Sequence, residues 1–110
     1  MSAVCTIDAI RSLGFVSISG AYAAVGSPTT NAARLICFTN NTDGDMFFTY
    51  DPTVDQLFVA AGSFKLFDIC SNRDDRNGVY LLPSSLQWSV KQSTAPSRGS
   101  VYIEVLYGME

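Results

Sequence analysis

The sequence predicts an all-β protein, an antiparallel β-sandwich of jelly-roll-like form, and three observations lead to this prediction. About eight short runs rich in β-branched and aromatic residues recur at intervals of about 8 to 14 residues. Glycine, proline, asparagine and aspartate stand between the runs, as turn residues do. The chain has 110 residues, of which 47% are hydrophobic, so it can form one domain with a real core. Regularly spaced short strands in a small domain are typical of sandwiches and barrels.

The N-terminal stretch VCTIDAIRSL, residues 4–13, leaves its structure open. Its apolar residues recur three apart, with Thr6 as a potential N-cap and Gly14 as a C-terminal stop, which would suit a short helix. A strand or an extended arm fits equally well, because VCTI is rich in β-forming residues and so short a helix is marginal. We therefore expect an N-terminal arm or short helix over 1–14 and a single β-sandwich domain over 15–110.

The expected strands follow in chain order from Phe15 onward. Each is a short apolar or alternating run that ends at a cluster of turn residues. They are expected at residues 15–19, 34–39, 46–50, 56–60, 63–70, 79–82, 86–92 and 100–107.

Alternation along these runs predicts which side chains face the core. In SVYIEVLY, Val101, Ile103 and Val105 share one face. In LQWSVKQ, Trp88 and Val90 do the same. The expected core comprises Leu35, Phe38, Phe48, Leu66, Trp88, Val90, Val101, Ile103 and Val105.

Several runs also carry apolar residues on the face opposite the core. Scattered exposed apolar residues are ordinary, but three strands with this feature favour an interface and a homodimer. The expected interface residues are Tyr102, Leu106, Phe47 and Phe67.

The stretch TNNTDGDMFF, residues 39–48, could be a cation site, a catalytic carboxylate pair or a turn. Asp43 and Gly44 lie between two β runs, and Asp-Gly is a strong signal for a type I′ hairpin turn. An EF-hand loop requires glycine at its sixth position and glutamate at its twelfth, whereas Pro52 is twelfth counted from Asn41. The sequence therefore predicts a turn that holds no metal.

The composition argues against catalysis. The chain has no histidine, which excludes catalytic dyads and triads built on that residue. A carboxylate hydrolase stays conceivable among ten acidic residues, but no pair is marked by spacing. Cys5, Cys37 and Cys70 contain no CxxC pair, and we interpret them as thiols made in a reducing compartment. We expect no enzyme activity and no cofactor.

Charge and hydropathy exclude two classes of partner. The net charge is −3, with seven basic residues scattered singly, so a nucleic-acid partner is not expected. No apolar run approaches the roughly 18 residues of a membrane span, so no membrane partner is expected either.

Two long stretches resemble a known class of protein. RLICFTNNTDGDMFFTYDPTVDQLFVAAGSFKLFDICSNR and QWSVKQSTAPSRGSVYIEVLYG are similar to small virion proteins of tailed bacteriophages, above all to capsid decoration (cement) proteins of short-tailed phages. The resemblance spans roughly residues 30 to 108 in overall texture, without a diagnostic motif. It implies a jelly-roll-like sandwich on the outer surface of the capsid, in contact with the major capsid protein as a homodimer. It also implies assembly in the host cytoplasm and no catalytic residues.

Two other functions stay open. One is a phage neck or tail adaptor, which shares the structural role. The other is a carbohydrate-binding β-sandwich, in which Trp88, Tyr50 or Tyr102 would stack on a sugar.

Overall fold

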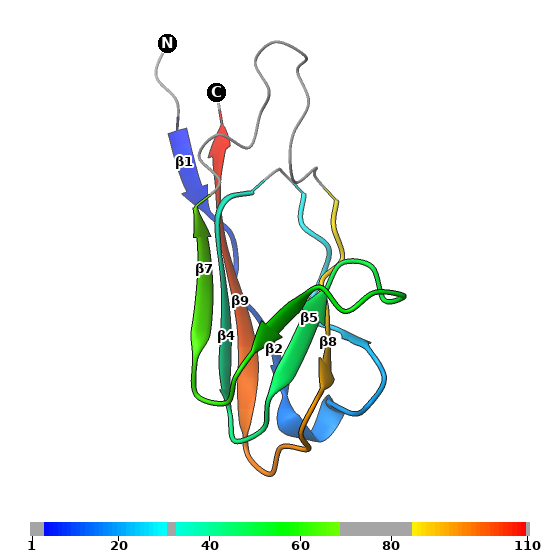
Figure 1. Cartoon of the computed structure of the whole chain (residues 1–110). Coiled ribbons are helices and arrows are strands. Elements are labelled where there is room, and N and C mark those ends of the chain that lie inside the picture. The colour runs from blue at the N-terminus through cyan, green and yellow to red at the C-terminus, as the bar shows by residue number, and fades with distance from the viewer. Residues whose placement is uncertain (1–3, 31–32, 69–84, 110) are drawn as a thin grey trace.

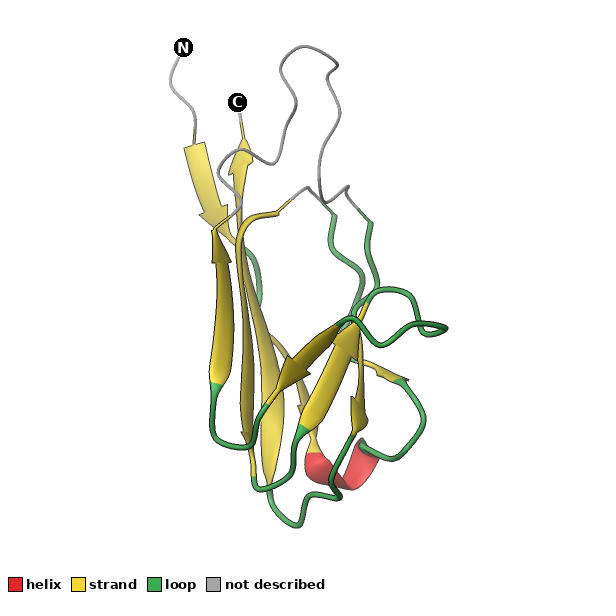
Figure 2. Cartoon of the chain, in the orientation of Figure 1, coloured by secondary structure: helices red, strands yellow, loops and turns green. Residues whose placement is uncertain are grey.

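The computed structural model describes residues 4–30, 33–68 and 85–109, and these residues form a sandwich of two antiparallel β-sheets (Figures 1 and 2). The predicted all-β sandwich is confirmed, whereas the jelly-roll form is not. No α-helix occurs in the described ranges, so no helix there could cross a membrane.

The first sheet, sheet A, has the strand order β1-β9-β4-β7, and β2 also pairs with β9. Sheet B has the order β3-β8-β5-β6. The strands of sheet A are β1 (Val4–Ile7), β2 (Arg11–Gly14), β4 (Ala33–Thr42), β7 (Phe64–Asp68) and β9 (Gly99–Met109). The strands of sheet B are β3 (Ala23–Ala24), β5 (Met46–Thr49), β6 (Leu57–Val59) and β8 (Ser89–Gln92), and a 3₁₀ turn, η1 (Phe15–Ser17), follows β2.

The N-terminal residues are part of sheet A and form no helix. Ile7 in β1 lies opposite Leu106 of β9, and Leu13 in β2 lies opposite Val101. The strand alternative for this stretch is therefore the one that the structure adopts. One long strand, β9, serves as the partner of both short ones (Figure 1).

Most of the later strands lie where they were expected, but the strand at 15–19 is wrong. Gly14 pairs with Ser100, and β9 begins only one residue earlier, at Gly99. No ladder partner is left for Phe15–Ser17, so these residues turn as η1 instead. The run at 86–92 is strand only from Ser89. The expected strand at 79–82 lies outside the described residues.

The core fills the space between the sheets. Phe38 of β4 has its ring centroid 5.3 Å from that of Phe48 and 4.7 Å from that of Trp88, so it joins sheet A to sheet B. Seven of the expected core residues are buried: Phe38, Phe48, Trp88, Val90, Val101, Ile103 and Val105. The sequence did not single out Val25, Ile36, Met46 and Val59, which are also buried.

Leu35 and Leu66 were predicted in the core, and this is wrong. Ile36 is buried in β4, so its neighbour Leu35 faces the opposite side of the sheet. Leu66 lies opposite Cys37, on the same outward side, and is 57% exposed. The error has a simple cause, because a one-residue change of phase in a strand exchanges its two faces.

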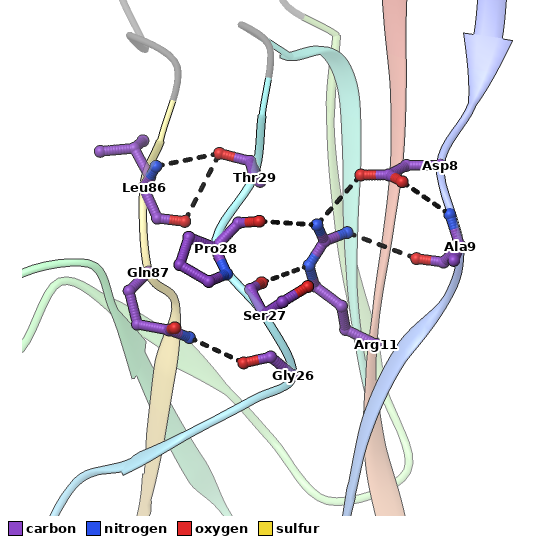
Figure 3. A network of polar contacts seen from close by, with 9 residues as sticks. All are labelled: Asp8, Ala9, Arg11, Gly26, Ser27, Pro28, Thr29, Leu86 and Gln87. Carbon is purple, nitrogen blue, oxygen red and sulfur yellow. Dashed lines mark hydrogen bonds and ion pairs between the residues drawn. The ribbon is translucent and has the colours of Figure 1, made fainter.

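One side of the sandwich is closed by a buried arginine (Figure 3). The Arg11 guanidinium donates to the carbonyl oxygens of Ser27 at 2.7 Å and Pro28 at 3.1 Å, and forms an ion pair with Asp8 at 3.0 Å. The two hydrogen bonds link β2 to the segment that leads into β4, and the ion pair links β2 to the residues between β1 and β2. Gly26 lets this segment approach, because a Cβ there would lie 2.8 Å from the Arg11 Cγ.

Candidate interaction surface

The outer face of sheet A is the face turned away from sheet B. In β9, Val101, Ile103 and Val105 are buried against the core, which confirms the predicted inward row. Tyr102 and Leu106 therefore face outward, as predicted, and both are only half-buried.

Strand register gathers apolar side chains from four strands on this outer face. Leu106 lies opposite both Ile7 of β1 and Leu35 of β4. Thr39 of β4 lies between Tyr102 on one side and Phe64 of β7 on the other. Cross-strand neighbours of this kind have Cβ atoms about 5 Å apart, so the side chains form one surface. We call this surface the outer patch and define it by Ile7, Leu35, Phe64, Leu66, Tyr102 and Leu106.

The outer patch is unusually exposed for such apolar residues. Ile7 is 77% exposed, Phe64 63% and Leu66 57%. All five residues of β7 are exposed, and β7 is an edge strand of sheet A among the described strands. Exposed apolar surface on a sheet face is typical of interaction sites. The exposed Glu104 lies within this surface, between Tyr102 and Leu106 on β9 and opposite Cys37 of β4.

The four predicted interface residues do not come together. Tyr102 and Leu106 belong to the outer patch. Phe47 lies on the outer face of sheet B, where its ring centroid is 5.5 Å from that of Phe58. Phe67 lies opposite Ile36 in the β4–β7 register and turns inward, with its ring 6.0 Å from that of Phe38. Only two of the four can thus share one contact surface.

Sequence reasoning missed four members of the outer patch: Ile7, Leu35, Phe64 and Leu66. Ile7 was not assigned to a sheet face, because the stretch that contains it fitted a helix as well as a strand. Leu35 and Phe64 depend on which face of β4 and β7 turns inward, and the short runs RLICFT and FKLFD are apolar on both faces. The pairing with β9, whose alternation is clear, is the signal that would have found them.

The outer face of sheet B is covered in part by the chain's own polar side chains, although Phe58 is 41% exposed there. The Lys91 Nζ lies 5.7 Å from the centroid of the Phe47 ring and 5.0 Å from that of Tyr22. The same ammonium group forms an ion pair with Asp55 at 2.9 Å, and the Tyr22 hydroxyl donates to Asp55 at 2.7 Å. Burial raises the pKa of the Tyr22 hydroxyl, and its hydrogen bond to Asp55 lowers the pKa of that carboxyl.

A cavity of about 340 Å³ lies between the sheets, beside the edge strands β6 and β7. Its apolar wall includes Phe38, Phe67 and Trp88, and Tyr50 lies at the same cavity. The Trp88 side chain is only 4% exposed, and its ring lies nearly perpendicular to that of Tyr50, with centroids 5.3 Å apart. Trp88 therefore presents no open ring face on which a sugar could stack.

The stretch around Gly44 is a turn, as predicted, but not a type I′ hairpin. Neither Asp43 nor Gly44 has a positive φ, and the turn connects β4 of sheet A to β5 of sheet B. Glycine is required for a different reason, since a Cβ on Gly44 would lie 2.2 Å from the carbonyl oxygen of Thr94. The buried Asn40 amide fixes the turn by donating to the carbonyls of Gly44 at 2.8 Å and Val59 at 2.9 Å.

The two acids of this turn bind separate backbone segments. The Asp43 carboxylate accepts from the Ser97 N–H at 2.7 Å and from the Ser97 hydroxyl. These bonds lower the pKa of Asp43 from 3.8 to about 2. The Asp45 carboxylate accepts from the Ala61 N–H at 2.9 Å. No group of three or more metal-ligating side chains occurs in the part of the chain that the structure describes.

No family model matches the sequence, and no curated protein matches it. Among solved structures, a chain from the study "Bacillus endospore appendages form a novel family of disulfide-linked pili" is similar over 100% of this chain and 93% of that chain. The TM-score is 0.48 and the identity 10%, too low to carry any argument about this protein.

Proposed function

We propose that this protein is a structural virion protein that decorates and stabilises a bacteriophage capsid. It binds the outer surface of the shell through the outer patch of sheet A, and the major capsid protein is its partner. It acts without a cofactor and without catalysis, in the virion, after assembly in the host cytoplasm. The choice of a capsid shell as the partner rests on the resemblance of residues 30 to 108 to capsid decoration proteins.

The observation that carries the proposal is the exposure of the outer patch. Phe64 and Leu66 are 63% and 57% exposed on a sheet whose other face carries the buried core side chains of β4 and β9. A decoration protein buries apolar surface on the shell, and aromatic residues are enriched at such contacts. The half-buried Tyr102 at the centre of sheet A would be a natural anchor, because large rings in the middle of an interface carry much of the binding energy.

Co-sedimentation with purified empty shells of the phage that encodes the chain tests the proposal. The wild type should sediment with the shells, and Tyr102→Asp and Leu106→Asp should lose most of this binding, because each places a charge in the contact. Val54→Asp is the matched control, since Val54 is a 50% exposed apolar residue in the loop between β5 and β6. Equal binding by all four proteins would contradict the proposal.

The two alternatives predict different partners. A neck or tail adaptor would leave empty shells bare and bind portal or tail complexes instead. A carbohydrate-binding module would bind immobilised glycans, and the burial of Trp88 speaks against this role. Testing the purified protein on shells, tail complexes and a glycan array separates the three functions.

A further inference from the structure

We propose that two copies of this chain join edge to edge through β7, as antiparallel strands related by a twofold axis at Leu66. The starting observation is that β7 is the last strand of sheet A among the residues that the structure describes, and that it is exposed along its whole length. An open edge strand is a template for a further strand, and a second copy can supply it. This inference does not depend on the identity of the shell.

The backbone of β7 is in the right phase for such pairing. The Asn40 N–H donates to the Ser63 carbonyl at 2.9 Å, and the β4–β7 register continues from this pair. Hydrogen-bonded pairs alternate in an antiparallel ladder, so Lys65 and Phe67 turn their backbone groups toward β4. The backbone N–H and C=O groups of Leu66 and Phe64 consequently point away from β4, toward the open edge.

A twofold axis perpendicular to the sheet must pass midway between one residue of β7 and the same residue of the partner copy. An axis at Leu66 makes a hydrogen-bonded pair of Leu66 with the partner's Leu66, using the N–H and C=O groups that point outward. It also places Lys65 opposite the partner's Phe67, twice across the axis.

Charge decides between this register and its neighbours. Lys65 and Phe67 both lie on the inward side of β7, so each ammonium group would meet an aromatic ring of the other copy, a favourable cation–π contact. An axis at Lys65 would instead place two ammonium groups opposite each other. An axis at Phe67 would leave Phe64 without a partner residue within β7.

The dimer would extend the proposed function without being needed for it. Because the axis is perpendicular to the sheet, both outer patches end on the same side of one continuous sheet. The two patches could then engage two neighbouring shell subunits at once, which raises binding strength through effective concentration.

Sedimentation velocity of the full chain across micromolar concentrations measures the association. We expect a dimer, and we expect Leu66→Lys to weaken it about tenfold or more by bringing like charges together at the axis. Folding should survive, because Leu66 is 57% exposed. The matched control is Phe58→Lys, which alters a 41% exposed apolar residue on the edge strand of sheet B and should leave the dimer unchanged.

Two further variants test the register. Lys65→Glu should weaken the dimer about fivefold to thirtyfold, as expected for two lost cation–π contacts. In a background with the native cysteines replaced by serine, Leu66→Cys should cross-link rapidly with a short bismaleimide, and Lys65→Cys should cross-link slowly.

A wild type that stays monomeric at hundreds of micromolar would overturn the inference and would identify Lys65 as an inward-pointing charge that guards the edge. A dimer that withstands Leu66→Lys but is lost in Tyr102→Asp would overturn it too, by moving the contact to the outer patch. Neither result bears on shell binding, which the co-sedimentation assay measures separately.

Discussion

The outer faces of the two sheets are both rich in apolar residues, but they differ in what covers them. On sheet B, Phe47 packs against Phe58 and lies beneath the Lys91 ammonium group, which is held by Asp55. On sheet A, Phe64 is 63% exposed. An aromatic residue on an outer face is thus not in itself a sign of an interface. An interface is instead indicated by an apolar residue that the rest of its own chain leaves exposed.

The largest expected effect concerns the core that the two sheets share. Trp88→Ala should lower the free energy of unfolding by about 3 to 5 kcal/mol, because it removes a large side chain packed against Phe38. Urea unfolding followed by circular dichroism measures the change. A loss below about 1 kcal/mol would mean that Trp88 does not join the two sheets.

A smaller effect is expected at the connection between the sheets. Asn40→Ala should cost about 2 to 3 kcal/mol of unfolding free energy, since it leaves the buried carbonyls of Gly44 and Val59 without their amide donor. The same urea experiment checks it, with the exposed Asn41→Ala as its control. Equal stability of the two variants would contradict this role for Asn40.

Substitutions in the outer patch should change the exposed apolar area but hardly change stability. Leu66→Ser should change the free energy of unfolding by no more than about 0.5 kcal/mol, because the side chain has few contacts to lose. Binding of an apolar dye to the folded protein should fall, since the exposed area shrinks. In sheet B, Lys91→Ala should raise dye binding by uncovering Phe47. Equal dye binding by wild type and both variants would remove the distinction between the two outer faces.

The turn between the sheets predicts a pH dependence. The pKa of Asp43 is lowered to about 2 in the folded protein, from 3.8, by its bonds to Ser97. A depressed carboxyl pKa adds stability that is fully present above 3.8 and is lost as the pH falls through about 2. Asp43→Asn should therefore lower the melting temperature at pH 6 and flatten its decline between pH 5 and 2. An unchanged acid decline would exclude Asp43 as its source.

The smallest effect expected is none at all. Melting curves with EDTA and with millimolar calcium should superimpose, because Asp43 and Asp45 accept hydrogen bonds from different segments, at Ser97 and Ala61. A calcium-dependent rise of several degrees would show that these carboxylates leave their backbone partners to bind a cation.

Alternation alone predicted the faces of β9 correctly, because its polar residue Glu104 breaks the apolar run on one side only. It could not do so for β7, where FKLF is apolar on both sides and Lys65 points inward. Phase in such a strand is set by its neighbour β4, which is a long-range contact. The prediction of a type I′ hairpin at Asp43 and Gly44 failed for a related reason. The same local turn residues suit a hairpin within one sheet and a connection between two sheets.

Cryo-electron microscopy of shells incubated with the protein tests the central claim most directly. The account predicts density in which the outer face of sheet A, with Tyr102 and Leu106, lies against the major capsid protein, while Phe47 and Lys91 of sheet B face solvent. Density with sheet B against the shell, or shells without any added density at saturating protein, would contradict it.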